Sequence, residues 1–274
     1  MPIIAITREM GSLGKDVAQG VADSLGLPVI YHEVIDHLAD RMRVRKSHVI
    51  RLLDGSAGLL ERLTADKTSM AVFTADEIFG VAARGKGAVI RGWGATQLLR
   101  DVPHALCVRV CAPLDVRRRR MMERLGTEDA AAVADEIRTN DEAHAAIIRR
   151  HFDVQWTEPE NYDLVMNTKR VTIDECVSEV LTLARAPQFA ETEASRQKLD
   201  DLALAARVRA ALRRAPETRD ARVLVSSEGG RITLSGASST DEMLAFVEVA
   251  SAVPGVADVA YHTPSGDEAR PRLH

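Results

Sequence analysis

Short apolar runs that alternate with segments of helical spacing constrain the fold more than any other feature of this sequence. Residues 3–7 (IIAIT), 88–91 (AVIR), 105–111 (ALCVRVC) and 162–167 (YDLVMN) are typical of buried strands. A further short run begins at Pro28. Strands that alternate with helices predict the α/β class, with a largely parallel sheet flanked by helices.

The segments between these runs have apolar residues at helical spacing. A helix follows the first strand and stops at Gly26. Residues 33–84 read as helices with a break near Asp54 and Gly55, and residues 114–152 read as an arginine-rich helical hairpin. A helix over 173–185 closes this part of the chain.

The pattern changes in the last third of the chain, and 274 residues suit two domains. We predict a first domain over 1–185, a linker over 186–198, a small domain over 199–263 and a frayed tail over 264–274. The small domain has the order αββαβ. Its elements are a helix over 202–212, two alternating strands over 222–226 and 231–235 around a glycine turn, a helix over 239–252 and a strand over 256–261.

Composition excludes several classes of function. A net charge of -4 argues against a protein built mainly to hold nucleic acid. The three cysteines (Cys107, Cys111 and Cys176) form no zinc pattern and fit buried thiols in a reducing compartment, so we expect a cytoplasmic protein. We expect no bound metal cluster, no export signal and no membrane span, because no run of about 18 apolar residues occurs.

The turn after the first strand is a candidate anion site. A glycine turn that enters a helix collects backbone N–H groups and the positive end of the helix dipole. We therefore expect phosphate to be bound at residues 11–16, through Gly11, Ser12, Leu13, Gly14, Lys15 and Asp16, with Lys15 on the β- and γ-phosphates of a nucleotide.

The turn departs from the usual phosphate-loop pattern at two positions. Glu9 stands where the first glycine is expected, and Asp16 stands where a Ser or Thr normally binds Mg²⁺. Arg8 or an arginine from the hairpin would have to offset Glu9, and Ser12, Asp16 or water would have to serve the metal. An ordinary strand-to-helix turn with a solvated Lys15 is the alternative.

Three ordered blocks resemble the cytidylate kinase-like family. They are IIAITREMGSLGKDVAQGVADSLGLP at the start, AVIRGWGATQLLRDVPHALCVRVCAPLDVRRRR over 88–120, and WTEPENYDLVMNT over 156–168. The resemblance covers about residues 1–185. It implies a P-loop nucleoside-monophosphate-kinase fold, with ATP and Mg²⁺ as donor and cofactor and CMP or dCMP as the acceptor.

The resemblance also assigns roles to side chains. The arginines at 117–120 and Arg124 correspond to a lid, and with Lys15 the catalytic set would be Arg117, Arg120 and Arg149. His144 stands where the family tends to have arginine. The acceptor side would involve Tyr31, His32, Asp36, Arg91 and Trp93. Trp93 replaces the arginine expected after Gly92. Asp163, Asn167 and Trp156 are expected to shape and pack the structure.

Residues 199–263 resemble a BON domain through the strand GRITLSG and the segment VPGV. The resemblance implies a tethering, sensing or self-association module, with contact to a lipid surface or formation of a homo-oligomer left open. Arg207, Arg209, Arg213 and Arg214 would face an anionic surface, or would simply be solvated.

Three functions remain open from the sequence. The first is a kinase that transfers the γ-phosphate of ATP to a nucleoside monophosphate. The second is a pseudokinase that binds a nucleotide without turnover and signals or scaffolds through the BON-like module, as Glu9, Asp16 and Trp93 would suggest. The third keeps the kinase but changes the acceptor to another small metabolite.

Overall fold

The computed structural model describes residues 1–53, 66–92, 94–220, 222–236 and 239–263. Contacts divide the chain into two compact units. The first unit consists of Met1–Ala65 and Arg84–Thr192, and the second of Asp66–Ala83 and Glu193–His274. Each unit is described on its own below. The break expected near Asp54 and Gly55, the tail over 264–274 and Trp93 lie outside the described residues.

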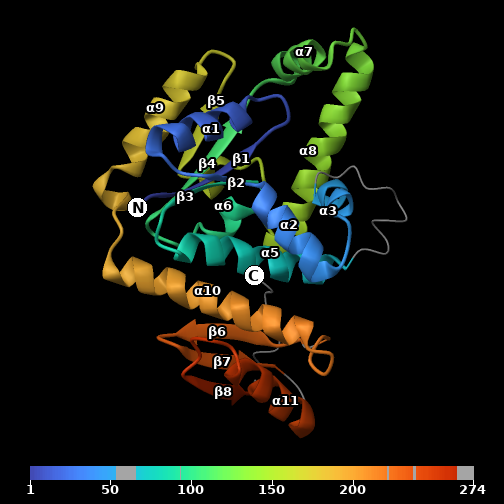
Figure 1. Cartoon of the computed structure of the whole chain (residues 1–274). Helices are drawn as coiled ribbons and strands as arrows, with labels where there is room; N and C mark the ends of the chain where they lie inside the picture. Colours follow the sequence, from blue (N-terminus) through green and yellow to red (C-terminus); the bar gives the residue numbers. More distant parts are fainter. Residues whose placement is uncertain (54–65, 93, 221, 237–238, 264–274) are drawn as a thin grey trace. The chain divides into compact units, whose positions relative to one another are not determined.

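The first unit contains a five-stranded parallel sheet with the order β2-β3-β1-β4-β5 (Figure 1). Its strands are β1 (Ile3–Arg8), β2 (Val29–Ile30), β3 (Ala88–Arg91), β4 (Ala105–Cys111) and β5 (Leu164–Asn167). The predicted parallel sheet is thus confirmed. The chain leaves β1 toward β2 and leaves β4 toward β5, in opposite directions. The edge beyond β1 and β4 is therefore the switch point at which such sheets bind ligands.

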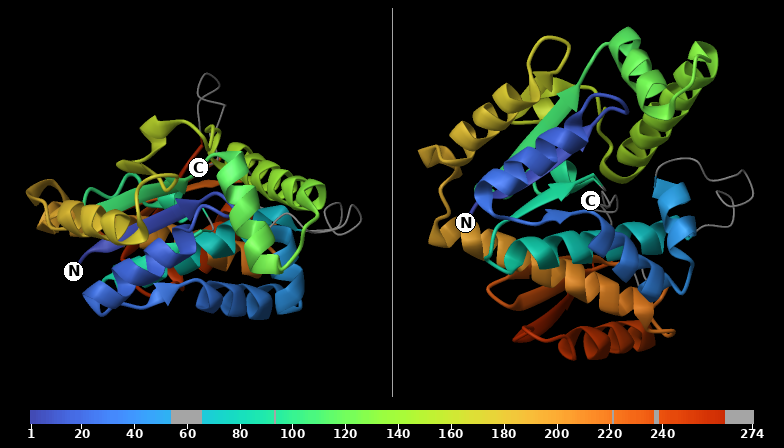
Figure 2. Two further views of the ribbon diagram at one scale, coloured as in Figure 1. Left: turned by 90° about the horizontal axis from the view of Figure 1, so that it is seen from above. Right: turned by 45° about the horizontal axis from the view of Figure 1, so that its top comes forward.

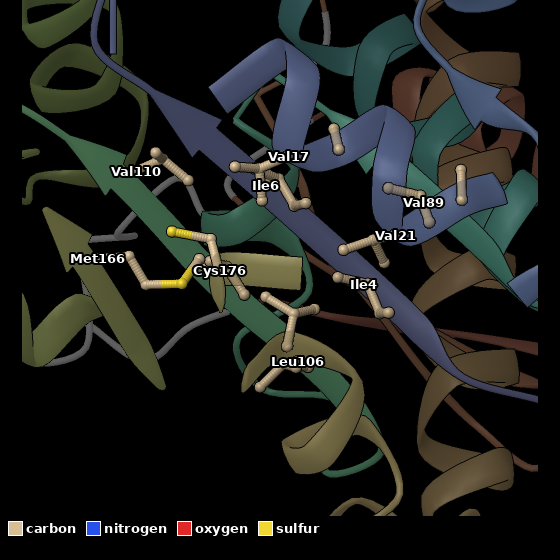
Figure 3. Close-up of a cluster of buried hydrophobic side chains, with 13 residues drawn as sticks. Ile4, Ile6, Val17, Val21, Val89, Leu106, Val110, Met166 and Cys176 are labelled. Atoms are coloured by element: carbon tan, nitrogen blue, oxygen red, sulfur yellow. The ribbon is translucent and has the colours of Figure 1, made fainter. Parts of the chain in front are cut away.

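One hydrophobic core of the first unit lies on the sheet face covered by α1 (Gly14–Leu25) and α9 (Ile173–Ala184) (Figures 1 and 3). Ile4 and Ile6 of β1 pack there with Val17 of α1 and Val180 of α9. Because strand side chains alternate between faces, Thr7 points to the opposite face. That face is covered by the short helix α6 (Ala95–Leu98), whose Thr96 carbonyl accepts a hydrogen bond from the Cys107 thiol at 3.3 Å.

Two further helix pairs complete the first unit. One is α2 (His32–Met42) with α3 (Lys46–Leu53), and the other is α7 (Leu114–Leu125) with α8 (Ala130–Phe152). Figure 2 shows α7 and α8 side by side as a hairpin. Gly126, with φ of 63°, ends α7, and the Asp129 carboxylate caps α8 by accepting from Ala132 N at 2.9 Å. These two caps explain why the predicted hairpin turns at this point.

The second unit contains the predicted αββαβ order: α10 (Glu193–Arg214), β6 (Leu224–Glu228), β7 (Arg231–Ser235), α11 (Thr240–Ser251) and β8 (Asp258–His262). β7 pairs antiparallel with β6 and parallel with β8. Its core is built from side chains such as Leu204 and Val208 of α10, Ile232 and Leu234 of β7, and Phe246 of α11.

The structure differs from the sequence-based boundaries in two respects. Helix α10 begins at Glu193, inside the segment expected to be a linker. The second unit also includes α5 (Lys67–Ala83), which lies between β2 and β3 in the sequence. Helix α5 packs along α10, a long-range contact that local periodicity does not reveal.

Candidate functional site

The turn between β1 and α1 has a defined shape fixed by bonds to β4. Glu9 N donates to the Val110 carbonyl at 3.0 Å, and the buried Ser12 hydroxyl donates to the same carbonyl at 3.0 Å. Gly11 and Leu13 have left-handed φ values of 79° and 63°. A Cβ on Gly11 would lie 2.9 Å from the Arg117 carbonyl oxygen, so only glycine fits there.

The turn presents hydrogen-bond donors that the protein does not use. Among the described residues, the backbone hydrogen bonds of this turn leave out the N–H groups of Gly11, Leu13, Gly14 and Lys15. These groups lie at the start of α1, where the helix dipole is positive. The side chain of Lys15 is exposed. The arrangement suits an anion with several oxygen atoms.

The carboxylate of Glu9 is turned toward β4 and does not fill the turn. Its Oε1 accepts from Arg109 Nη2 at 2.6 Å, and its Oε2 accepts from Ala112 N at 3.1 Å. Arg117 Nε lies 3.4 Å from Oε2. The Glu9 side chain is 14% exposed, and those of Arg109 and Arg117 are 8% and 9% exposed. Two guanidinium groups therefore neutralise this carboxylate away from solvent.

Arg117, predicted to be catalytic, is buried beneath the turn. It donates to the carbonyls of Ala112 at 2.9 Å and Met10 at 3.2 Å, and to Asp141 Oδ2 at 2.7 Å. These contacts join α7, α8 and the phosphate turn at one side chain. Here the guanidinium supports the turn through protein contacts.

Arg120 lies one turn along α7 and also reaches the site. It donates to the hydroxyl of Thr168 at 3.0 Å and to the Thr168 carbonyl at 2.7 Å. The same hydroxyl donates to the Ser12 carbonyl at 2.8 Å. Arg120 is thus linked to the turn through Thr168, the residue that follows β5.

The other predicted lid cations do not converge on the turn. Arg149 is exposed in the last turn of α8, and Arg118, Arg119 and Arg124 are exposed on α7. Arg118 and Arg119 line an open hollow of about 710 Å³ between α7 and the start of α8. Arg8 lies closer to the site than these residues. An ideal Cβ on Gly14 would come within 2.5 Å of the Arg8 Cβ.

A polar cluster lies behind the turn, in which Thr7 and Trp156 are buried and His144 is half-buried. The Thr7 hydroxyl accepts from Trp156 Nε1 at 3.1 Å and lies 3.3 Å from His144 Nε2. The His144 and Trp156 rings meet edge-on, with centroids 4.4 Å apart. Burial, and then the charges of Arg8 and Arg109, lower the pKa of His144 to about 4. His144 is therefore neutral at pH 7 and does not supply the charge of the arginine it replaces.

Two of the predicted acceptor-side residues meet. The guanidinium carbon of Arg91 lies 3.8 Å from the centroid of the Tyr31 ring, a cation–π contact at the end of β3. Asp36 instead pairs with Lys46 at 2.7 Å. Trp93 and the side chain of His32 lie outside the described residues.

Three predictions about supporting residues are confirmed. Trp156 is 3% exposed and packs as an anchor. Asp163 Oδ2 accepts from Cys107 N at 2.7 Å and fixes the start of β5. Asn167 Oδ1 accepts from Lys169 N at 3.0 Å and shapes the end of that strand.

Sequence reasoning missed Arg109 and Thr7 as parts of the site. Arg109 was visible as a single cation within the apolar run 105–111, and a buried charge requires a partner. Thr7 gave no comparable signal, because threonine is common in strands.

The described residues contain no group of three or more His, Cys, Asp or Glu side chains able to hold a metal ion. Ser12 is fully buried and its hydroxyl donates to Val110, whereas the Asp16 carboxylate is exposed next to Lys15. Of these two candidate metal ligands, Asp16 is the accessible one. In the part of the chain that the structure describes, no helix is long and apolar enough to cross a bilayer.

The comparison with protein families decides which family the chain belongs to. The sequence model of the cytidylate kinase-like family matches residues 3–170, which include the turn, the lid hairpin and β5. The chain belongs to the cytidylate kinase-like family. A BON domain model matches residues 200–263, which include α11 and all three strands of the second unit.

The chain is similar to several solved structures, and the first of them supports the fold. An uncharacterized protein from Eubacterium ventriosum ATCC 27560 aligns with a TM-score of 0.54 and 21% identity, over 68% of this chain and 99% of that one. A shikimate kinase from Bacteroides thetaiotaomicron aligns with a TM-score of 0.42 and 16% identity, over 68% of this chain and 99% of that one. A sugar kinase from Janibacter sp. HTCC2649 aligns with a TM-score of 0.44 and 18% identity, over 70% of this chain and 99% of that one. No curated protein matches the chain.

Four arginines of α10 were expected to face an anionic surface. Three of them form hydrogen bonds within the second unit. Arg207 donates to the Pro254 carbonyl at 3.0 Å, and the part-buried Arg209 donates to the Val225 carbonyl at 2.6 Å. Arg213 bonds to Asp66 and Ser69. Arg214 is exposed. The basic face of α10 is therefore largely used for internal structure.

Proposed function

We propose that this member of the cytidylate kinase-like family transfers the γ-phosphate of ATP to a nucleoside monophosphate, with CMP or dCMP as the leading acceptor. One observation carries the proposal. The turn after β1 offers the unused N–H groups of Gly11, Leu13, Gly14 and Lys15, while Glu9 is neutralised by Arg109 and Arg117. Phosphoryl transfer depends mainly on such positioning and on positive potential.

The residues of the turn have distinct roles in this proposal. The backbone N–H groups would cradle the β-phosphate, and the exposed Lys15 would extend to the γ-phosphate. Arg8 and Arg120 would add positive charge at the rim of the turn. Arg117 would hold the turn through the Met10 carbonyl, and the exposed Arg149 would reach phosphate only if the lid moves.

Mg²⁺ fits this turn through Asp16. Its carboxylate is exposed one residue after Lys15, and Mg²⁺ in kinases is held by one or two carboxylates, phosphate oxygens and water. When bound, the ion neutralises charge on the β- and γ-phosphates. Asp16 would orient a water of its hydration shell.

The acceptor would lie beside β3, where Arg91 stacks on Tyr31. A guanidinium held in this way can bind the acceptor phosphate, and the Tyr31 edge can contact its base. Asp36 lies one helical turn further along α2 and would contribute through its pairing with Lys46. Because Trp93 replaces the arginine that the family resemblance predicts, another small phosphate-accepting metabolite is the alternative acceptor.

Steady-state assays test the proposal. The full-length protein is incubated with ATP, Mg²⁺ and each of a panel of nucleoside monophosphates, and the phosphorylated products are measured. We expect turnover that falls at least about 100-fold on Lys15→Ala, because the γ-phosphate loses its point charge. The exposed Lys86→Ala serves as the control and should retain activity. Turnover by Lys15→Ala equal to wild type would refute the assignment.

A pseudokinase is the second candidate, and a specific observation favours it. Arg117 and Arg120, both predicted to bind phosphate, are occupied by protein partners. Calorimetry with ATP separates the two candidates. Binding without product for every acceptor in the panel would support the pseudokinase, which would signal or scaffold through its BON domain. Measurable product would exclude it.

We place this activity in the cytoplasm. The three cysteines are free thiols, which fits a reducing compartment.

A further inference from the structure

Helix α10 carries two separate apolar faces. Leu204, Ala205, Val208 and Leu212 face the three-stranded sheet and belong to the core of the BON domain. A second stripe, also buried but outside that core, consists of Ser195, Leu199, Ala203, Ala206 and Ala210. Its members recur every three or four residues, so they share one face of the helix. An isolated domain of this type would expose the stripe to water.

Helix α5 packs along α10 within the second unit (Figure 1). Small residues on one helix allow the backbone of another to approach closely. Helix α5 supplies large apolar side chains, including the buried Phe73, Ile78 and Phe79. Because α5 packs along α10, we infer that α5 is the partner of this stripe within the same unit.

Polar contacts fix the two helices at both ends. At one end, Arg213 donates to both oxygens of Asp66 at 3.0 Å and to the Ser69 hydroxyl at 2.7 Å. Asp66 in turn caps α5, because its carboxylate accepts from Ser69 N at 2.9 Å. The helix begins where this contact is made.

At the other end, Arg196 Nη2 donates to the Ala83 carbonyl at 2.6 Å. Ala83 is the last residue of α5, where carbonyls lack intrahelical partners. Arginines 17 residues apart on α10 thus contact the capping residue Asp66 and the last residue of an antiparallel α5. Apolar packing of α5 on α10 does not by itself require a charged donor at each end of α5.

Helix α5 belongs to the kinase segment by sequence. It lies inside the range 3–170 that matches the family, and residues 84–87 connect it to β3. Strand β3 ends at Arg91, which stacks on Tyr31. The helix held by α10 is therefore four residues from a strand that carries the proposed acceptor side.

We propose that the BON domain acts in cis, as a clamp that sets the position of α5 and, through residues 84–87, the order of β3 and Arg91. The surface is the second stripe of α10 with Arg196 and Arg213, and its partner is α5. This differs from a module tethered by a linker, because the clamp engages the kinase segment in the middle of its sequence. The inference concerns α5 and β3 and does not require catalysis.

Hydrogen exchange followed by mass spectrometry on the full-length chain tests the clamp without any nucleotide. The variant Arg196→Met/Arg213→Met removes both terminal contacts and keeps the length of the side chains. Peptides from 67–83 should exchange about tenfold faster, because charge-assisted bonds are lost at both helix ends. Peptides from 84–92 should also exchange faster, and those from β6 to β8 should not change.

Arg207→Met is the matched control. Arg207 also lies on α10 and donates to a carbonyl, but its partner is Pro254. Exchange in 67–83 that is the same in the double variant and in this control would overturn the clamp. Faster exchange in 67–83 without a change in 84–92 would overturn its transmission to β3.

If the amides of β6 to β8 also exchange faster in the double variant, the BON domain itself is destabilised, and a milder variant is used to test the clamp. Arg213→Lys keeps the charge but cannot make the paired contact with Asp66. It should raise exchange in 67–83 by a few-fold, against no change for Arg207→Lys. Equal exchange in both would refute the proposal. Since no step uses ATP, this outcome is separate from that of the kinase assays.

Discussion

At the scale of single residues, Glu9 shows how the candidate phosphate turn accommodates a carboxylate at its entrance. An unpaired negative charge a few ångströms from phosphate would oppose binding by several kcal/mol in a poorly solvated site. Here Arg109 and Arg117 contact the carboxylate and neutralise it, and Asp141 balances the second charge of Arg117. The carboxylate also accepts the Ala112 N–H and thereby joins the turn to β4.

Glu9→Gln should therefore destabilise the protein by about 2 kcal/mol, because buried Arg109 loses its carboxylate partner and Arg117 keeps only Asp141, while the shape is kept. Urea unfolding followed by circular dichroism measures this. Glu142→Gln is the control, since Glu142 forms an exposed pair with Arg138 and should change stability by less than about 0.5 kcal/mol. Equal effects of the two variants would contradict the role of Glu9.

His144 gives a prediction about pH. Its pKa is lowered by burial to about 4, so the unfolded chain, with a pKa near 6.5, binds the proton more readily. The stabilisation is complete above pH 6.5 and is lost as the pH falls toward 4. Between pH 7 and pH 5 it should decrease by about 2 kcal/mol.

The measurement is the free energy of unfolding in urea at pH 7 and pH 5 for wild type and for His144→Gln. The variant keeps a polar partner for Thr7 and lacks the titrating ring. Its stability should therefore fall less over this interval than that of wild type. An identical fall in both proteins would show that other groups cause the pH dependence.

At the scale of secondary-structure elements, α7 has a buried inner face that contacts the rest of the unit and an exposed outer face. Arg117 and Met121 face inward and are buried, whereas Arg118 and Arg119 face outward. Arg117 connects the base of the lid to Met10 in the turn and to Asp141 on α8. The start of α7 is thus tied to the turn after β1 and to α8.

Arg117→Met should cost about 3 kcal/mol of stability and weaken ATP binding, because Glu9 and Asp141 would keep buried charge without their shared partner. Thermal unfolding and calorimetry with ATP measure the two effects. Arg118→Met, one residue away and exposed, should leave both within error. Normal stability and affinity in Arg117→Met would mean that α7 is held by packing alone.

At the scale of the whole molecule, the division of the chain into units does not follow sequence order. Helix α5 lies within the kinase segment by sequence and belongs to the second unit by contact. It is apolar around most of its circumference, which is typical of a helix covered on several sides. The kinase segment therefore depends on residues beyond 192 to cover one of its own helices.

Truncation after Thr192 should leave the apolar side chains of α5 without the cover of α10. We expect a marked rise in fluorescence of the dye ANS and a lower soluble yield for the truncated chain, relative to the full-length protein. Circular dichroism should show how much helix is lost. A truncated protein that stays soluble, does not bind ANS and keeps the helical signal of residues 1–192 would contradict this expectation.

The sequence determined the elements and the fold class by itself, because both rest on local chemistry. The apolar, β-branched run over 3–7 is typical of a buried strand, and the glycines at 11 and 14 predict a tight turn before a helix. The αββαβ order of the last domain was equally readable from its alternation and its glycine turn. The sequence could also have predicted that Arg109 has a charged partner, since a lone cation in an apolar strand needs one.

Only the tertiary structure decided which partners those residues have. The pairing of Glu9 with Arg109 spans 100 residues, and that of Arg213 with Asp66 spans 147. Such contacts depend on which strands become neighbours and on which helix covers which face. Local periodicity states that a face is apolar, but it does not state what packs against it. For that reason Arg117 was expected at the phosphates and is found beneath the turn, and α5 was expected with the first domain and is found on α10.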